Sequence, residues 1–391
     1  MELQTPYFVI KKDELDTLFE SLKSVLIKYW NNYIIGYSYK TNSLPWIIKY
    51  FQRQHCFAEV VSEEEYELAK IIDTKLNCII YNGPIKSKES FLEALKNGSF
   101  VNIDSQREIE WLDELDICGS YKIGIRVNFD IERECPGQSS GGENGGRFGF
   151  CYENGELSRA IDKIKKRGLE IKGLHIHVSS KTRSTDIYKA SAKKACEIAM
   201  NYGMNLEFID IGGGFFGGLS NRPQFEDYFK IISKELKELF SPEHTTLIVE
   251  PGMSLIGSPV SYITSVIDVK DTTYGRFVVT DGTRTSIDPL MTKTGYFHKF
   301  QYVNKDNSRI PKQTIVGYTC MENDRLFTVN NEKKLSVGDK IIYNKVGAYT
   351  MCLTPLFIKY FPDVYVEDKN EMIQVRKKWA PVNYIQSHLM E

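Results

Sequence analysis

"CFAEVVSEEEYELAKIID", residues 56–73, joins a short run of apolar and β-branched residues to a stretch with apolar residues at helical spacing. The first part predicts a strand over 56–61, and the second predicts a helix over 63–73 with a charged outer face. Similar strand-like runs lie at 33–40, 77–81, 100–103, 122–128, 172–178, 206–211 and 245–250. Further helical stretches lie between them at 86–97, 155–167 and 184–201. Eight strands that alternate with helices are typical of an α/β protein with a (β/α)8 TIM barrel.

The pattern changes after about residue 258. Strand-like segments then follow one another closely, without a long helix, at 260–269, 276–280, 313–318 and 337–344. We therefore expect a barrel over 25–258 and a C-terminal all-β domain, a β-barrel or sandwich, built from 259–391. Residues 1–24 are assigned to the β domain as well, because "TPYFVI" at 5–10 precedes the first barrel helix. The Gly/Ser-rich stretch 131–146 predicts a long mobile loop.

Composition excludes several classes of protein. The 50 Lys and Arg residues balance 51 Asp and Glu residues, so charge gives no reason to expect a nucleic acid or an anionic membrane as partner. No apolar run reaches 18 residues, and the N-terminus turns polar too early for a leader, which predicts a cytoplasmic protein. The eight cysteines form no CxxC pair, so we expect reduced, mostly buried thiols and no metal site.

Chemically specific residues lie at the predicted C-terminal strand ends, where TIM barrels place their active sites. The first strand ends in Lys40, the sixth ends in His177 with Ser180 close behind it, the seventh runs into Gly212–Gly214, and the eighth ends in Glu250. Each has an ordinary explanation alone: a solvated lysine, a core histidine, a tight turn, a helix cap. Together they favour pyridoxal 5'-phosphate, with Lys40 as the Schiff-base lysine, glycine N–H groups on the phosphate and Glu250 on the pyridine nitrogen.

These motifs resemble those of the fold-type III pyridoxal-phosphate decarboxylases, which include diaminopimelate decarboxylase and eukaryotic ornithine decarboxylase. The match spans nearly the whole chain, in the family's order, and implies an alanine racemase-like barrel. In "YSYKTNS" (37–43) it assigns the cofactor-binding lysine to Lys40. It places Glu59 of "FAEVVS" near the cofactor ring, His177 in a stack on that ring, and Arg126 of "GIRVN" beside Glu250 as its partner.

The resemblance also implies a phosphate site and a dimer. Ser180 and Gly212–Gly214 correspond to the phosphate cradle, which Tyr349 of "VGAYT" joins from the β domain. Cys320 of "GYTCMENDRL" matches the cysteine that family members supply from the second subunit, as general acid at the reacting carbon. The resemblance therefore implies a homodimer with two shared active sites.

The departures from the family concern the far end of the substrate. Met253 stands where diaminopimelate decarboxylases have an arginine, Asp288 where they have another, and Met321 where they have an acid. Because a buried charge without a partner is costly, this set argues for a larger or less charged side chain than diaminopimelate or ornithine. Glu322, Asp324 and Asp288 are candidates for holding an amine in its place.

The expected function is decarboxylation of an amino acid, free or carrier-bound, to the corresponding amine. Lys40 is displaced by the substrate, carbon dioxide leaves, and Cys320 of the partner subunit or water returns a proton. Two alternatives stay open: a diaminopimelate decarboxylase of lysine biosynthesis, and an amino-acid racemase. A racemase needs paired bases and usually an arginine at the pyridine nitrogen, which Glu250 contradicts.

Overall fold

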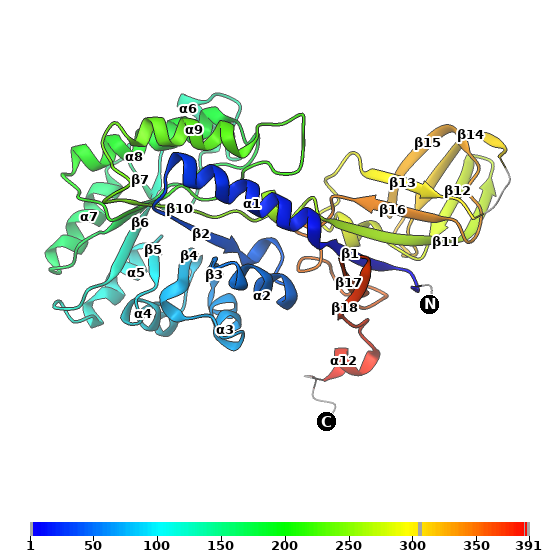
Figure 1. The fold of residues 1–391 in the computed structure, drawn as a ribbon, viewed down its shortest axis with the longest axis horizontal. Helices are drawn as coiled ribbons and strands as arrows, with labels where there is room; N and C mark the ends of the chain where they lie inside the picture. The colour runs from blue at the N-terminus through cyan, green and yellow to red at the C-terminus, as the bar shows by residue number, and fades with distance from the viewer. Residues whose placement is uncertain (1–2, 304–306, 387, 389–391) are drawn as a thin grey trace. The chain divides into compact units, whose positions relative to one another are not determined.

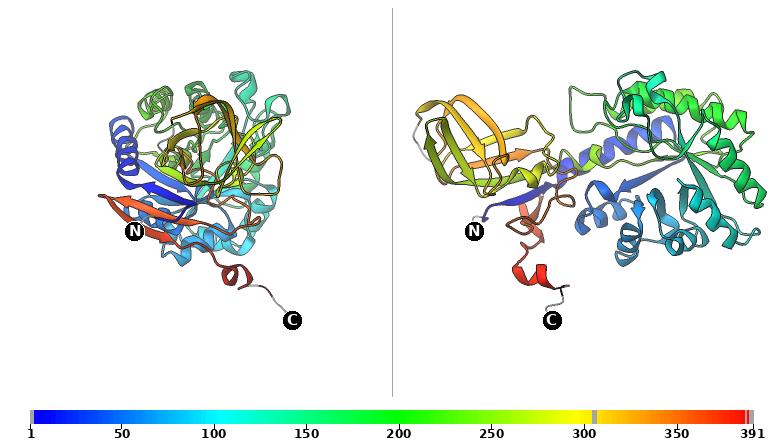
Figure 2. Two further views of the ribbon diagram at one scale, coloured as in Figure 1. Left: turned by 90° about the vertical axis from the view of Figure 1, so that its right-hand side faces the viewer. Right: turned by 180° about the vertical axis from the view of Figure 1, so that it is seen from behind.

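The protein divides into two compact units, each with its own sheet. The computed structural model describes residues 3–303, 307–386 and 388. One unit comprises Phe19–Ser254, and the other comprises Met1–Leu18 with Leu255–Glu391 (Figures 1 and 2).

Eight parallel strands of the first unit close into a barrel in the described residues. Their order is β5-β4-β3-β2-β10-β9-β8-β6, and β6 pairs with β5 to close the ring. They are β2 (Tyr33–Ser38), β3 (Phe57–Ser62), β4 (Ile79–Ile85), β5 (Phe100–Ile103), β6 (Lys122–Asn128), β8 (Gly173–His175), β9 (Phe208–Asp210) and β10 (Thr246–Val249). A short strand, β7 (Phe150–Cys151), pairs with β6 alone. The predicted (β/α)8 barrel is confirmed.

Helices precede, connect or follow the barrel strands, and the longer ones lie on the outer side of the barrel (Figures 1 and 2). They are α1 (Lys12–Tyr29), α2 (Pro45–Arg53), α3 (Glu63–Ile71), α4 (Lys88–Lys96), α5 (Gln106–Trp111), α6 (Ile131–Glu134), α7 (Glu156–Lys166), α8 (Thr185–Asn201), α9 (Phe225–Leu236) and α10 (Met253–Ile256). Several begin at a serine whose oxygen accepts a backbone N–H of the first turn, which fixes the strand-to-helix turn: Ser62, Ser87, Ser105 and Ser184. None of the described helices is long and apolar enough to cross a membrane.

Apolar side chains fill one end of the barrel. Ile80, Phe100, Phe208 and Ile248 form a buried cluster, in which the Phe100 and Phe208 rings meet edge to face at 5.0 Å. Gly173 leaves no room for a side chain because Phe208 lies against its backbone. The cluster lies near the starts and middles of the strands, so polar side chains gather at their C-terminal ends.

The second unit is mostly sheet. Its strand order is β15-β14-β12-β11-β1-β17-β18, and β16 pairs with both β11 and β13. The strands are β1 (Tyr7–Lys11), β11 (Val260–Thr272), β12 (Gly275–Thr280), β13 (Phe297–Gln301), β14 (Arg309–Val316), β15 (Arg325–Lys333), β16 (Lys340–Asn344), β17 (Asp363–Asp368) and β18 (Glu371–Arg376). Two short helices are present, α11 (Arg284–Ile287) and α12 (Pro381–Ile385). Because β1 lies between β11 and β17, this sheet is built from both ends of the chain.

The stretch 131–146 has more order than its composition predicts. It begins with α6, which Asp130 caps by accepting the N–H of Arg133, and it contains a 3₁₀ turn at Gly142–Asn144. The carboxylate of Glu132 accepts a hydrogen bond of 2.6 Å from the Ser139 hydroxyl, which ties the loop to itself. Apart from these two short elements the stretch is a loop, in which side chain-to-backbone contacts replace regular pairing. That the loop is mobile stays a prediction.

Candidate active site

Lys40 lies at the rim of the barrel. It is part of a 3₁₀ turn, Tyr39–Thr41, that follows β2 directly. Its Nζ lies 2.6 Å from Oε2 of Glu59, on the adjacent strand β3, and its side chain is 42% exposed, whereas that of Glu59 is fully buried. The buried carboxylate thus holds the amine at the C-terminal end of the strands, where it is accessible to a carbonyl group.

Two asparagines that the sequence analysis did not single out link the carboxylates of the site. Asn82, on β4, donates one hydrogen bond of 3.0 Å to Glu59 and another to Oε1 of Glu250. Asn102, on β5, donates to Oδ1 of Asn82 at 2.8 Å and to Oδ2 of Asp210 at 3.1 Å. All five side chains are buried. They form one hydrogen-bonded layer across the inside of the barrel.

The three carboxylates of this layer carry too much negative charge for the cations beside them. Burial raises the pKa of Glu59, but the charge of Lys40 and the hydrogen bonds from Lys40, Ser38 and Asn82 outweigh it and hold that pKa below its usual value. Burial raises the pKa of Asp210 to about 7. Burial, together with the charges of Asp210 and Glu59, raises the pKa of Glu250 well above its usual value. A cation placed against Glu250 would relieve this excess, and the protonated ring nitrogen of the predicted cofactor would be such a cation.

The three glycines at 212–214 leave no room for a side chain. Gly212 (φ 70°) and Gly214 (φ 86°) have left-handed backbones, and an added Cβ would lie 2.6 Å from His177 and from the Ser180 hydroxyl, respectively. At Gly213 an added Cβ would lie closer than 3.0 Å to the carbonyl oxygen of Glu250. The glycines thus bring their backbone next to His177, Ser180 and Glu250, as the sequence predicts. Such a backbone cradle fits a phosphate group.

His177 is held beside Ser180, with 3.3 Å between Nε2 and the hydroxyl oxygen. Burial, and then the charges of Arg126 and Lys40, lower the pKa of His177 to about 3, so its ring is neutral at physiological pH.

Arg126 does not pair with Glu250 in the described structure. Its Nη1 donates instead to Asp104 at 2.9 Å, because Ile103 and Ile125 are partners on β5 and β6 and the next residues therefore lie side by side. The prediction that Arg126 pairs with Glu250 was therefore wrong, and the sequence analysis missed Asp104 as its partner.

His175 is a second missed residue, two positions before His177. It is 2% exposed, and neither ring nitrogen has a hydrogen-bond partner. Its Nε2 lies 3.6 Å from Oε2 of Glu250. Ligand atoms of His175, Asp210 and Glu250 lie within 4.8 Å of one another, so this cluster also has the spacing of a metal site, which the sequence analysis did not expect. The signal was the alternation in "HIHV" (175–178), which points both histidines to one side.

The acids proposed for a substrate amine are engaged within the second unit. Asp288, 2% exposed, accepts from Arg284 Nε at 3.0 Å, from the Tyr296 hydroxyl at 3.0 Å and from two backbone N–H groups. Asp324, equally buried, accepts from Thr283, Thr319 and two backbone N–H groups. These contacts count against an amine-binding role for either. Glu322 is exposed and pairs with Arg325 at 3.0 Å.

Four further predicted site residues are described by their own surroundings. Met253 begins α10 and is half-buried, as is Met321. Cys320 is exposed, and Tyr349 is exposed with a left-handed backbone (φ 54°). Their approach to a cofactor stays a prediction.

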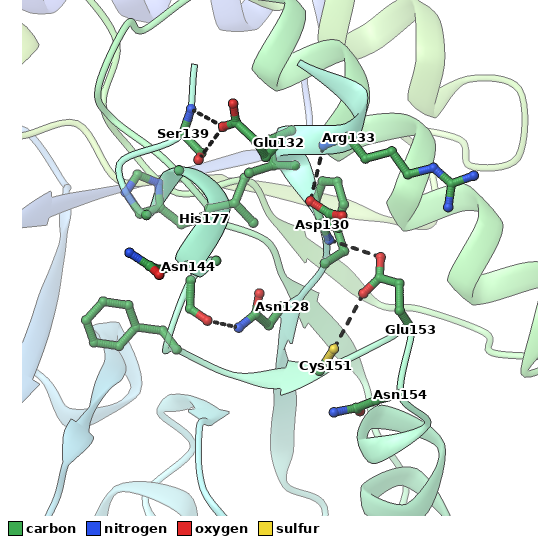
Figure 3. A pocket seen from close by; sticks show the side chains of 18 residues that line it. Asn128, Asp130, Glu132, Arg133, Ser139, Asn144, Cys151, Glu153, Asn154 and His177 are labelled. Carbon is green, nitrogen blue, oxygen red and sulfur yellow. Dashed lines mark hydrogen bonds between the residues drawn. The ribbon is translucent and has the colours of Figure 1, made fainter. Parts of the chain in front are cut away.

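A cavity of about 750 Å³ lies beside His177 in the barrel unit (Figure 3). The stretch 131–146 and the ends of β6 and β7 form its wall. Asn128 donates to the Gly146 carbonyl at 2.6 Å, and Glu153 accepts the Asp130 N–H at 3.0 Å. These bonds hold the wall in place, so the cavity borders the candidate cofactor site on one side.

Comparisons with known proteins agree with this geometry. Residues 13–257 match the family model described as pyridoxal-dependent decarboxylase, pyridoxal binding domain. A probable chloroplastic diaminopimelate decarboxylase of Oryza sativa is 26% identical over 96% of this chain and 77% of its own length, and one of Aquifex aeolicus is 24% identical over 90% and 83%. The crystal structure of diaminopimelate decarboxylase from M. jannaschii matches with a TM-score of 0.85, at 21% identity over 100% of this chain and 93% of that one. A chlorella virus arginine decarboxylase bound to agmatine matches with a TM-score of 0.77, at 20% identity over 93% and 98%.

Proposed function

The chain belongs to the pyridoxal-dependent decarboxylases, and from this premise we propose that Lys40 is the residue that binds the cofactor and that the substrate is an amino acid of the diaminopimelate type. Pyridoxal phosphate is the cofactor of the family and supplies the electron sink for loss of carbon dioxide. The observation that carries the assignment of Lys40 is its Nζ, 2.6 Å from the buried Glu59 at the open end of the barrel.

The remaining residues have roles that follow from their surroundings. Glu250 is the group that would face the ring nitrogen and hold a proton there, since its charge is otherwise unfavourable in this layer. The neutral ring of His177 can lie flat against an aromatic ring without adding charge. Gly213, Gly214 and Ser180 are the groups that would donate N–H and O–H to the phosphate, since the Gly212 N–H is already donated to Asp210 Oδ1 at 2.9 Å.

The substrate proposal rests on the relatives, whose names include diaminopimelate decarboxylases of rice, Aquifex and M. jannaschii. A related structure from Helicobacter pylori is described as complexed with L-lysine. A second candidate is an amino acid with a larger or less charged side chain. Met253 and Met321 favour it, as does Asp288, whose carboxylate is already engaged by Arg284 and Tyr296. The cavity of about 750 Å³ beside His177 gives such a substrate room.

We also propose a homodimer in which Cys320 reaches the site of the other subunit, where its thiol returns the proton to the reacting carbon. The thiol is exposed in the single chain, as a residue that acts across an interface would be. Mixing the Lys40→Ala and Cys320→Ala proteins should restore activity that neither has alone, because a mixed dimer keeps one complete site. Lack of restoration, with each protein dimeric, would contradict the shared site.

The decisive experiment for the substrate is release of carbon dioxide by the protein loaded with pyridoxal phosphate. The panel contains meso-diaminopimelate, both enantiomers of ornithine, lysine, arginine and glutamate, and acylated derivatives, with Lys40→Ala as control. Rapid release from diaminopimelate supports the first candidate. Release only from larger or less charged amino acids supports the second. Retention of activity by Lys40→Ala refutes the assignment of Lys40 as the cofactor-binding lysine.

A further inference from the structure

His175, Asp210 and Glu250 come together because of the register of three adjacent strands. His175 on β8 is the partner of Asp210 on β9, and Asp210 is the partner of Ile248 on β10. Register partners on parallel strands point to the same side of the sheet, which brings His175 and Asp210 together inside the barrel. Glu250 follows two residues after Ile248 and so points the same way.

His175 carries a hydrogen-bond donor that nothing in the described structure uses. A neutral imidazole always has one N–H group, and both ring nitrogens of His175 are buried without a partner. The 3.6 Å between its Nε2 and Oε2 of Glu250 is too long for a hydrogen bond. A buried donor left unpaired is destabilising, so the stability of the fold does not explain a histidine at this position.

The charges around His175 keep it neutral. Burial lowers its pKa well below the usual value, and nearby cations add to the effect. The charged and titratable groups that face the cluster are Lys40, Glu59, Lys86, Arg126 and His177. Glu250 needs no second donor while it carries a proton. Once ionised, its Oε1 still accepts from Asn82, and two further groups lie close to its carboxylate: the ring of His175, whose Nε2 is 3.6 Å from Oε2, and Asp210, with which Glu250 shares a side-chain hydrogen bond. Asp210 can donate only while it carries a proton, whereas a neutral His175 always has an N–H group.

We propose that His175 is a positioning residue. Its Nε2–H group donates a hydrogen bond to Glu250 when Glu250 is ionised against the cofactor's ring nitrogen. This inference rests on the proposed function of Glu250. The proton that Glu250 loses passes to the ring nitrogen, and His175 keeps its own, so no proton is gained from or lost to solvent. A movement of a few tenths of an ångström closes the contact to hydrogen-bond length.

The test compares variants that replace different ring nitrogens. A glutamine amide reaches the position of Nε2, an asparagine amide reaches that of Nδ1, and leucine keeps the bulk but has no donor. Affinity of the cofactor-free protein for pyridoxal phosphate is measured by absorbance titration without substrate, in a chelating buffer because the cluster also has metal-site spacing. His175→Leu and His175→Asn should weaken binding by about tenfold or more, and His175→Gln by less than about threefold, because a hydrogen bond to a charged group is lost only in the first two.

A second arm separates this role from packing. In a Glu250→Gln background position 250 carries no carboxylate to accept from His175, so His175→Leu should change cofactor affinity by less than about twofold. His244→Leu, an exposed histidine, serves as the matched control. Equal losses in both backgrounds, or a glutamine variant no better than asparagine, overturn the inference alone. A wild-type protein that binds no pyridoxal phosphate overturns the proposed function with it. If His175→Leu does not fold, the glutamine and asparagine variants decide in the same two backgrounds.

Discussion

Replacing Gly213 with alanine would place a methyl group where the backbone of Glu250 now lies. The added Cβ would lie closer than 3.0 Å to the Glu250 carbonyl oxygen, and the Glu250 N–H is bonded to the Gly212 carbonyl at 2.8 Å. The end of β10 must therefore move, by about 1 Å. Overpacking of this kind costs about 1–3 kcal/mol. A displacement of about 1 Å at a reacting group costs on the order of 100-fold in rate.

The assay measures kcat of the cofactor-loaded protein and the melting temperature of the cofactor-free protein. We expect Gly213→Ala to lower Tm by about 2–12 °C, at about 2–4 °C per kcal/mol for a unit of this size, and to reduce kcat strongly. Gly295→Ala is the control, because a Cβ added there would meet no atom within 4 Å beyond its chain neighbours and the backbone is not left-handed. Wild-type values of both kcat and Tm for Gly213→Ala would refute the packing argument.

Asp104→Ala leaves Arg126 buried without its carboxylate, so the free energy of unfolding should fall by about 3–5 kcal/mol in a urea titration; a loss below about 1 kcal/mol would contradict the ion pair. The pKa of Asp210 rises from 3.8 in the unfolded chain to about 7, so its contribution to stability is present below pH 3.8 and is lost as pH rises through 7. Asp210→Asn should therefore flatten the decline in the urea midpoint of the cofactor-free protein between pH 5 and 8, and an unchanged slope would count against the raised pKa. Asp288→Ala should lower the melting temperature because four hydrogen bonds are lost, whereas Glu322→Ala should leave it unchanged; equal values would show that Asp288 is not structural.

Much of the site was predictable because strand ends in a TIM barrel share one rim. Lys40 and Glu250 end predicted strands, and the glycine run follows another, so their convergence follows from the fold. The structure brings Gly213 against the Glu250 backbone and Gly212 against His177, contacts that also require glycine for reasons of space. Residue type and position along the chain were therefore sufficient to predict that Lys40, the glycines and Glu250 meet at one rim.

What the sequence could not provide was the pairing across strands. Asn82 and Asn102 are single polar residues in buried strands, and only the closed barrel shows that they connect Glu59 to Glu250 and Asp210. The partner of a buried charge depends on the register of the strands. The register of β5 and β6 pairs Arg126 with Asp104, where Glu250 was expected. Local patterns do not encode such long-range contacts, so these residues appear only in three dimensions.

The most direct test of the central claim is the site of covalent attachment of the cofactor. The protein is incubated with pyridoxal 5'-phosphate, reduced with borohydride and digested, and the peptide masses are measured. The account predicts one stoichiometric cofactor adduct, on Lys40, which is absent from Lys40→Ala. An adduct on another lysine, or none on Lys40 in a protein that releases carbon dioxide, would contradict it.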